Sequence, residues 1–468
     1  MRIGIGAPIK GTAETGASAI VNLLKGDPWL TNKADGRPGD RLATDWSWDD
    51  DGTTLRLKLR RDVYFHDGTL LTPAVAAEAL REQKLPTGQY SFQSVASIEP
   101  EGEDTVVLRL KERNSFILPD LTAVLVVKPG QRHIGTGPFQ LIRNENNDAF
   151  LTAFPRYYRG RSALAGIDIK SYPTQRNAWA AMMRGDVDML YDVSRDAAEF
   201  IEAETTVHAF SFPRPYYIPL AFNVRRPVLS NPQVRQAINE AVDRTILVRD
   251  GMRGRGTPAD GPVSPHNWAY SAPAVPFAYD PMSARRRLDA AGFPARMNAE
   301  RAVPIRFTFD CLVFADDTRF DRIALLVQKQ LADVGIDMRL VPLPLLDFGG
   351  RVKAGDFDAF LWEMSGRSLS RVYEFWRSHD GGMINSGYTA ADAVLDRIRG
   401  ARSEDEVRAG IAELGRVMHD DPPAAFLTWQ ETSRAVLTKF DVGPDDKRDI
   451  FTNLWQWRPA ATPTRATR

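Results

Sequence analysis

The segment 216–245 constrains the fold more than any other part of the chain, because it changes from a strand pattern to a helix pattern. Apolar residues occupy every second position in 218–222, which is typical of a half-buried strand. In 234–242 the apolar residues recur at helical spacing instead. The polar stretch 223–230 lies between the two patterns and is broken by Pro227. We interpret this stretch as a crossing from one lobe of the protein to another.

The length of the chain also favours more than one lobe. A chain of 468 residues is larger than a single hydrophobic core usually grows. Lysine and arginine (60) balance aspartate and glutamate (60), so charge gives no reason to expect nucleic acid or an anionic membrane surface as a partner. No apolar run reaches the roughly 18–20 residues that a membrane helix needs. The single cysteine, Cys311, excludes an internal disulfide and lies in an apolar stretch, where we expect it to be buried.

The region 305–340 predicts an α/β second lobe. Apolar residues alternate in 305–309 and again in 336–340, as in two strands. Between them, residues 323–334 keep helical spacing, and Gly335 suits the left-handed position at the end of a helix. A strand, a helix and a strand of this length imply a parallel sheet with a right-handed crossover.

Local signals predict a helix start and a turn. Asn231 followed by Pro232 predicts the start of a helix, since asparagine caps a helix and proline loses nothing at its first position. His66, Asp67 and Gly68 follow a strand pattern and read as a turn. A histidine beside an aspartate also suggests a catalytic dyad, but neighbours on a turn rarely face each other. We therefore expect a structural role for this motif.

Short motifs are spread along the chain in a fixed order. They are Leu42-Ala43 with Trp46, Leu59-Arg60 with Val63 and Phe65-His66-Asp67-Gly68, Gly135-Thr136-Gly137-Pro138-Phe139, Tyr157-Tyr158-Arg159-Gly160, Phe222-Asn223 with Val234-Arg235-Gln236-Ala237-Ile238, and Tyr279-Asp280. This series resembles that of the family 5 extracellular solute-binding proteins, the peptide- and nickel-binding receptors of ABC importers. The resemblance runs in order from about residue 41 to residue 437.

The resemblance implies a fold class, an α/β, two-lobed periplasmic-binding-protein fold of type II, cluster C. It places lobe 1 at 1–222, lobe 2 at 228–425, and a return to lobe 1 with a C-terminal tail at 426–468. A small extra subdomain of lobe 1 is expected at about 40–134, in a reduced form because the stretch before Gly135 is shorter than in the family. The tail is expected to be rich in β-strands.

The resemblance also implies a function. Such receptors close on a small ligand and deliver it, unaltered, to the permease of an ABC-type importer. The expected partners are this permease and a small ligand, either an oligosaccharide, a sugar acid or a peptide-like molecule. The protein is expected to be a monomer that needs no cofactor, metal or nucleic acid. We expect it in the periplasm or as a cell-surface lipoprotein, with an export segment absent from this sequence because the chain opens on a strand pattern at 1–6.

Two other classes of function fit the sequence less well. A ligand sensor or a chaperone-like relative would have the same fold without taking part in import. An enzyme needs a catalytic constellation, and the chain has no HExxH motif, no GxSxG nucleophile elbow and no complete phosphate loop. Its six histidines show no metal-ligand spacing. The two distant carboxylates of a glycosidase leave no sequence pattern, so that alternative stays open.

The resemblance places candidate ligand-binding residues at the end of a strand expected in 357–362, in a later loop and at the crossing. They are Trp362, Glu363, Ser365, Arg367, Asn385, Tyr388, Phe222 and Asn223. Each has an alternative structural role, as a core residue or as part of a turn. The weaker candidates are Trp268, Trp376 and Trp429.

The charges that follow Trp362 predict the kind of ligand. In peptide-binding members of the family, a carboxylate shortly after this tryptophan pairs with the α-ammonium of the peptide, which is costly to bury alone. Ser365 stands at this position here, and Arg367 follows it. Glu363 is a carboxylate, but neighbouring residues on a strand point to opposite faces. We expect an anionic or polyhydroxyl ligand, such as a sugar acid or an oligosaccharide, stacked on Trp362; the alternative is that Arg367 is an exposed loop residue.

Overall fold

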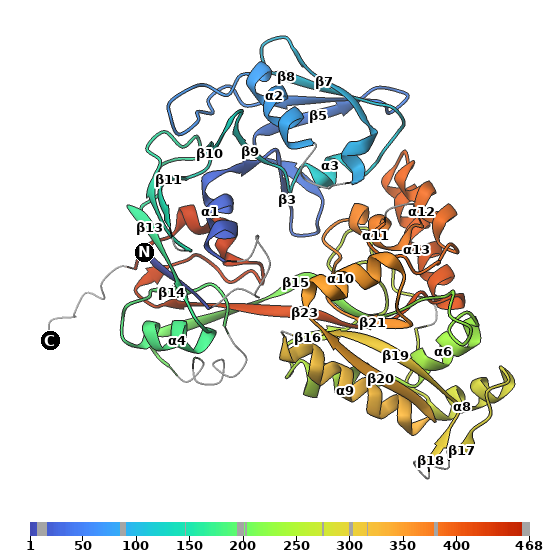
Figure 1. Ribbon diagram of the computed structural model, residues 1–468. Helices are drawn as coiled ribbons and strands as arrows, with labels where there is room; N and C mark the ends of the chain where they lie inside the picture. The colour runs from blue at the N-terminus through green and yellow to red at the C-terminus, as the bar shows by residue number, and fades with distance from the viewer. Residues whose placement is uncertain are drawn as a thin grey trace. The chain divides into compact units, whose positions relative to one another are not determined.

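The computed structural model describes residues 1–6, 16–84, 90–145, 147–193, 201, 204–273, 276–298, 303–315, 317–378 and 382–460. The chain divides into two compact units (Figure 1). Unit 1 comprises Met1–Arg113, Ile117–Pro213 and Thr432–Arg468, and unit 2 comprises Asn114–Phe116 and Arg214–Glu431. Each unit has its own hydrophobic core and its own helices, so each is described by itself below.

Two long strands carry the chain between the units. β15 (Val207–Phe222) passes from unit 1 to unit 2 after Pro213. β23 (Ala424–Leu437) returns to unit 1 after Glu431. These two changes of unit therefore fall inside strands, and not in the polar stretch 223–230.

Unit 1 contains a mixed sheet around the N-terminal strand β1. Its order is β11 (Phe139–Glu145), β12 (Asp148–Ala153), β13 (Gly166–Tyr172), β1 (Arg2–Gly6), β14 (Met189–Leu190) and the end of β23. β1 is parallel to β13 and β14, and the other pairs are antiparallel. The helices α1 (Ala17–Lys25) and α4 (Gln175–Met183) pack on this sheet. Ile3, Ile20 and Ile167 are buried in its core.

A second part of unit 1 covers the stretch expected to form the extra subdomain, about 40–134, and begins before it, since Trp29 and Leu30 belong to its core. Its antiparallel sheet has the order β5 (Ala43–Trp48), β6 (Thr54–Leu59), β8 (Thr105–Leu110), β7 (Val95–Glu101). The helix α2 (Pro73–Lys84) packs on β7 and β8 and shares one core with the sheet. Short elements of this part are β2 (Asp27–Pro28), β3 (Leu30–Asn32), β4 (Pro38–Asp40), η1 (Tyr90–Ser94), α3 (Ile117–Asp120), β9 (Leu125–Lys128) and β10 (Gln131–Gly135).

Two of the sequence motifs meet inside unit 1. The ring of His66 is buried, and its Nε2–H donates to the carbonyl oxygen of Gly137 at 3.0 Å. Its Nδ1 accepts from the backbone N–H of Gly135 at 3.4 Å. A side chain at Gly135 would collide with the backbone at the end of α1, which explains the glycine. Asp67 pairs with Lys128, so His66 has the expected structural role and is not oriented by its neighbour.

Unit 2 is built on a sheet that contains both parallel and antiparallel pairs. Its order is β23, β15, β21 (Ala359–Leu361), β19 (Phe307–Phe314) and β20 (Ile336–Leu343), with β22 (Met364–Ser365) also on β15 and β16 (Gly256–Pro258) on β23. β19 and β20 are parallel and are joined by α9 (Thr318–Asp333), which confirms the predicted strand–helix–strand unit. The predicted first strand is split, because Ile305 belongs to the hairpin of β17 (Arg296–Asn298) and β18 (Val303–Ile305). Cys311 is buried in β19 as expected.

Helices pack around the sheet of unit 2. Figure 1 shows α9 on one face and α10 (Leu345–Ala354) on the other. The helix predicted after 223–230 is α6 (Pro232–Glu240), and Asn231 caps it by accepting from the backbone N–H of Gln233 at 2.9 Å. Further helices are α7 (Arg244–Ile246), η2 (Leu247–Gly251), α8 (Pro281–Ala290), α11 (Leu369–Trp376), α12 (Asp392–Arg399) and α13 (Glu404–Asp420). In the part of the chain that the structure describes, no helix has the length and apolar character needed to cross a membrane.

The C-terminal tail differs from the expected β-rich structure. It contains the 3-10 helix η3 (Ile450–Gln456), and β24 (Phe440–Asp441) with β25 (Arg458–Pro459) forms a short pair. Asp449 caps η3 by accepting from the N–H of Phe451 at 3.1 Å. The apolar residues at 450, 451 and 454 follow helical and not alternating spacing, so they are buried together in the core of unit 1. Residues 461–468 lie outside the described residues.

Candidate functional site

The strands β21 and β22 both pair antiparallel with β15 in a single register. Leu361 lies opposite Leu220, and Ser365 lies opposite Tyr216. The same register puts Trp362 opposite Pro219. Proline has no N–H to donate, which explains why the pairing lapses between β21 and β22.

Side chains alternate between two faces along this register. Trp362 lies on one face, where its ring packs on Phe348 of α10 with 5.5 Å between the ring centroids. Glu363 and Ser365 lie on the other face, as the alternation in the sequence predicts. Arg367 is exposed and lies in the bend after β22, and the alternation extended to it puts it on this second face. A ligand that stacks on Trp362 and also pairs with Arg367 therefore has to reach both faces.

Glu363 is held by other side chains of unit 2. Its Oε2 accepts a hydrogen bond from Nε2 of Gln430 at 2.7 Å. The same oxygen lies 3.6 Å from a guanidinium nitrogen of Arg319 and 3.8 Å from one of Arg214. Arg319 also donates to Oε1 of Gln430 at 3.0 Å and to Asp317 at the start of α9. The half-buried carboxylate thus already has one hydrogen-bond donor and two cations beside it.

The Trp362 face of the sheet carries a buried aromatic cluster of Tyr217, Trp376, Phe426 and Trp429. Nε1 of Trp376 donates to the hydroxyl of Tyr217 at 2.9 Å, and burial raises the pKa of that hydroxyl. A side chain at Gly366 would come within 2.5 Å of the ring of Trp429. Trp376 and Trp429 therefore belong to the core of unit 2. The third weaker candidate, Trp268, lies under the guanidinium of Arg408, 5.5 Å from it.

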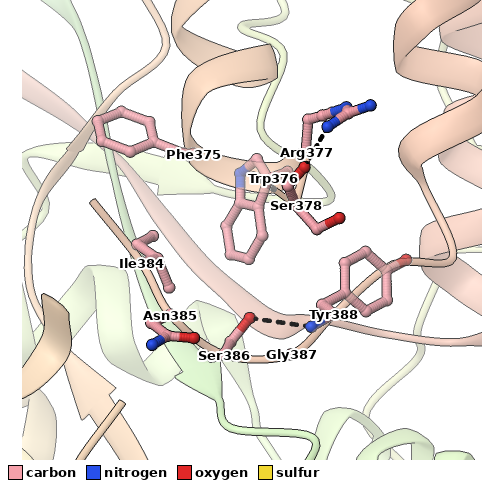
Figure 2. A pocket seen from close by; sticks show the side chains of 9 residues that line it. All are labelled: Phe375, Trp376, Arg377, Ser378, Ile384, Asn385, Ser386, Gly387 and Tyr388. Atoms are coloured by element: carbon pink, nitrogen blue, oxygen red, sulfur yellow. Dashed lines mark hydrogen bonds between the residues drawn. The ribbon is translucent and has the colours of Figure 1, made fainter. Parts of the chain in front are cut away.

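A pocket of about 390 Å³ lies in unit 2 between the end of α11 and the segment 384–388 (Figure 2). Figure 2 shows the indole of Trp376 between these two segments, with Ile384 on one side of it and Ser378 and Tyr388 on the other. The pocket brings together Asn385 and Tyr388, which are predicted site residues, and does not include the other six. Its lining is Phe375, Trp376, Arg377, Ser378, Ile384, Asn385, Ser386, Gly387 and Tyr388.

Hydrogen bonds hold the polar groups of this pocket in place. Asn385 is exposed, and its Oδ1 accepts from the guanidinium of Arg225 at 2.8 Å. Its amide nitrogen has no partner among the residues that the structure describes. The hydroxyl and the backbone N–H of Ser378 both donate to the carboxylate of Asp392. The free amide of Asn385 and the oxygen of Ser378 are therefore the polar groups that this side of the pocket offers to a ligand.

Tyr388 contributes a buried ring to the same pocket. Its hydroxyl is inaccessible and has no hydrogen-bond partner among the described residues. Burial, together with the carboxylates of Asp421 and Asp392, raises the pKa of this hydroxyl against the opposing charge of Arg235. The phenol is therefore neutral at physiological pH, so it brings a ring and no charge to the pocket.

Phe222 and Asn223 do not line this pocket and are both buried in unit 2. Nδ2 of Asn223 donates to the carbonyl oxygens of Gly355 and Phe357, at 3.1 and 2.9 Å. Its Oδ1 accepts from the N–H of Arg225 at 3.2 Å. These bonds use both ends of the amide and hold the end of β15 on the segment before β21.

Sequence reasoning missed the side chains that surround Glu363, which are Arg214, Arg319 and Gln430. They come from β15, α9 and β23, so only the folded sheet brings them together. The alternation of the two strands is their sole sequence signal, and alternation does not give the pairing register. Within the described ranges, no group of three or more histidine, cysteine, aspartate or glutamate side chains is arranged to hold a metal ion.

Comparisons with known proteins agree with this architecture. Residues 37–383 match the profile described as "Bacterial extracellular solute-binding proteins, family 5 Middle". The chain is 24% identical over 428 residues to heme-binding protein A of Haemophilus influenzae, and this match covers 82% of this chain and 77% of the relative. It is 25% identical over 320 residues to the glutathione-binding protein GsiB of Pectobacterium atrosepticum, which covers 64% of this chain and 60% of that relative.

Among solved structures, NikA of Brucella suis in complex with Fe(III)-EDTA has the same fold. It matches with a TM-score of 0.85 at 21% identity, over 98% of this chain and 100% of the NikA chain. The expected α/β, two-lobed periplasmic-binding-protein fold is thereby confirmed. With its motifs, its fold and the profile match over most of its length, the chain belongs to family 5 of the bacterial extracellular solute-binding proteins.

Proposed function

We propose that this solute-binding protein captures a small anionic or polyhydroxyl ligand and delivers it, unaltered, to the permease of an ABC-type importer. It works as a monomer outside the cytoplasmic membrane, in the periplasm or tethered to the cell surface by a lipid. Membership of the family supports the receptor function. The ligand class is argued from the surroundings of the segment that follows Trp362.

The class of ligand is inferred from the contacts of the Glu363 carboxylate. A peptide held by its free amino terminus needs a carboxylate, because a buried ammonium without a counter-charge is costly. Glu363 already accepts from Gln430 at 2.7 Å. Its carboxylate also lies 3.8 Å from Arg214 and 3.6 Å from Arg319, so an added ammonium would meet two like charges. A hydroxyl group of a ligand meets no such repulsion, and a carboxylate meets two guanidiniums against the single negative charge of Glu363.

The relatives and Arg367 support an anionic ligand. Haem and glutathione, for which the two relatives are named, both carry carboxylate groups at neutral pH. The guanidinium of Arg367 is exposed and has no hydrogen-bond or ion-pair partner among the described residues. It is therefore available to a carboxylate of the ligand.

The pocket beside Trp376 supports a ligand with hydroxyl groups. Ligand pockets usually combine an aromatic surface with a few polar groups that fix orientation. Here Asn385 and Ser378 supply the polar groups within a pocket of about 390 Å³. A sugar ring has apolar faces and a rim of hydroxyl groups, so its chemistry matches this lining.

Isothermal titration calorimetry tests the proposal. The probes are glucuronate, galacturonate, cellobiose, glutathione, trialanine and N-acetyl-trialanine, which lacks the ammonium. We expect micromolar or tighter binding of at least one acidic or polyhydroxyl probe and no preference for trialanine over its acetylated form. A probe at about 100 times its Kd stabilises the protein by about 2.7 kcal/mol, so thermal unfolding gives a second measurement.

Two results would overturn the proposal. Micromolar binding of trialanine that disappears in Glu363→Gln and persists in Arg367→Ala would show that the site recognises an ammonium. Conversion of a bound probe into product would show that the protein is an enzyme and not a receptor.

A further inference from the structure

Arg214 is a partly buried cation without a hydrogen bond among the described residues. Its guanidinium lies over the ring of Tyr216, 4.5 Å from the centroid. The carboxylate of Glu363 is 3.8 Å away, which is beyond hydrogen-bond distance. Arg319, the other arginine beside Glu363, is by contrast bound to Asp317. Arg214 therefore keeps its N–H donors for another acceptor.

The strand register brings a second arginine to Arg214. The pairing of β22 with β15 continues past Ser365, because the N–H of Gly366 donates to the carbonyl oxygen of Pro215 at 2.9 Å. Extending this register by one residue puts Arg367 opposite Arg214, at the bend where the chain leaves β22. Residues directly opposite each other on antiparallel strands have their side chains on the same face.

Among the described residues, the charged side chains that contact Glu363 or Arg319, counted together with Arg367, do not balance. Arg214, Arg319 and Arg367 contribute three cations, whereas Glu363 and Asp317 contribute two carboxylates. Like charges directly opposite each other on neighbouring strands are destabilising. The Arg214 side chain is 31% exposed and Arg367 is exposed, so an anion from solvent reaches both. A carboxylate matches the planar fork of a guanidinium and would remove the repulsion.

We propose that Arg214 and Arg367 together bind a carboxylate of the ligand. This inference rests on the proposed function and names the group that an anionic ligand presents to the Glu363 face. Ser365 adds a hydroxyl on that face. Its Oγ accepts from the N–H of Arg367 at 3.4 Å and keeps its proton for the same carboxylate.

Acids paired with neutral counterparts test the two arginines. The pairs are glucuronate with glucose, galacturonate with galactose, and glutathione with its diethyl ester. We expect the tightest-binding acid to bind wild type at least about tenfold more tightly than its counterpart, because charge-assisted hydrogen bonds are the strong ones. Arg214→Gln and Arg367→Gln should each lose about tenfold or more for the acid and leave the neutral counterpart unchanged. Arg286→Gln, on a side chain of α8 that is 68% exposed, is the matched control and should change neither.

Lysine variants keep the test valid if a glutamine variant unfolds. Arg214→Lys and Arg367→Lys keep the charge and lose the fork, so each should lose part of the affinity for the acid. If both glutamine variants bound the acid as tightly as wild type, the two arginines would not be its binding site. The proposed function would be unaffected by that result. Wild type that binds none of the acids would overturn the inference together with the anionic ligand of the proposed function.

Discussion

Nε2 of Gln430 donates to Oε2 of Glu363 at 2.7 Å and thereby joins β23 to the segment that follows Trp362. Gln430 is 3% exposed, and the other end of its amide accepts from Arg319 at 3.0 Å. One buried amide therefore bridges a carboxylate and a guanidinium that lie 3.6 Å apart. It also fixes the position of Glu363 on the face that carries Arg214.

Gln430→Met tests the importance of this bridge. Methionine has a similar shape but neither donor nor acceptor of comparable strength, so it leaves Glu363 and Arg319 short of one partner each. We expect a loss of about 2 kcal/mol in the free energy of unfolding, measured by urea denaturation. Gln93→Met, on an exposed side chain of η1, is the control and should change the free energy by less than about 0.5 kcal/mol. Equal effects of the two variants would contradict the bridging role.

Gly366→Ala tests how tightly the site segment packs on the aromatic cluster. The added methyl group would lie 2.5 Å from the ring of Trp429 and 2.9 Å from the carbonyl oxygen of Pro262. Overpacking of this kind costs about 1–3 kcal/mol, and we expect an unfolding free energy lower by that amount. Gly261→Ala is the matched control, since a side chain there meets open space. A destabilised control, or an unaffected Gly366→Ala, would show that the segment is not held against Trp429.

Tyr388→Phe removes the hydroxyl of Tyr388 and keeps its ring, so it tests what the hydroxyl contributes to stability. The buried hydroxyl has no partner among the described residues, so its removal relieves a desolvation cost. We expect the free energy of unfolding to stay the same or to rise by up to about 1 kcal/mol. Tyr270→Phe is the comparison, because the hydroxyl of Tyr270 donates to Asp260 at 2.5 Å and its loss should cost about 1 kcal/mol. A loss of stability in Tyr388→Phe as large as in Tyr270→Phe would show that the Tyr388 hydroxyl is hydrogen-bonded.

His66 makes the stability of unit 1 depend on pH. Burial, aided by the ammonium of Lys25, lowers the pKa of His66 to about 4 against the opposing hydrogen bond to Gly137. Protonation would also place a second N–H against the backbone N–H of Gly135, which now donates to Nδ1. Because the folded pKa lies below the unfolded value of about 6.5, the contribution of neutral His66 is complete above pH 6.5 and is lost as pH falls toward 4.

The size of this effect follows from linkage. The shift from about 6.5 to about 4 corresponds to roughly 3 kcal/mol of stability lost between pH 7 and pH 4. Between pH 7 and pH 4, the free energy of unfolding of His66→Gln should fall by about 3 kcal/mol less than that of wild type. Urea denaturation at a series of pH values measures both. Parallel curves for the two proteins would contradict the low pKa of His66.

Elements that depend on residues close in sequence were predictable. The cap of α6 at Asn231 and the β19–α9–β20 unit are of this kind, because spacing within a short window decides them. The full length of β15 was not predictable, since Pro213 and Pro215 lack N–H donors and interrupt the expected pattern. The helix η3 was missed because the family resemblance implied a β-rich tail, although Ile450, Phe451 and Leu454 keep helical spacing.

The candidate site was predictable only in part. Strand alternation predicts that Glu363 points away from Trp362, and the register agrees. The partners of Glu363 could not be predicted from the sequence. Arg319 and Gln430 lie on two other elements, and only the pairing of the sheet brings them to Glu363. The lapse in pairing at Trp362 was not predictable, because no local pattern reveals that this residue faces Pro219.

The burial of Cys311 makes this chain convenient for site-specific fluorescent labelling. Cys311 is the only cysteine of the sequence, and burial in β19 raises the pKa of its thiol, so the native thiol is a poor nucleophile. Cysteines introduced at Arg61 of unit 1 and Arg286 of unit 2, whose side chains are 64% and 68% exposed, would accept maleimide dyes without any change to Cys311. Energy transfer between the two dyes would then report ligand capture in real time, in a protein that keeps every native core residue.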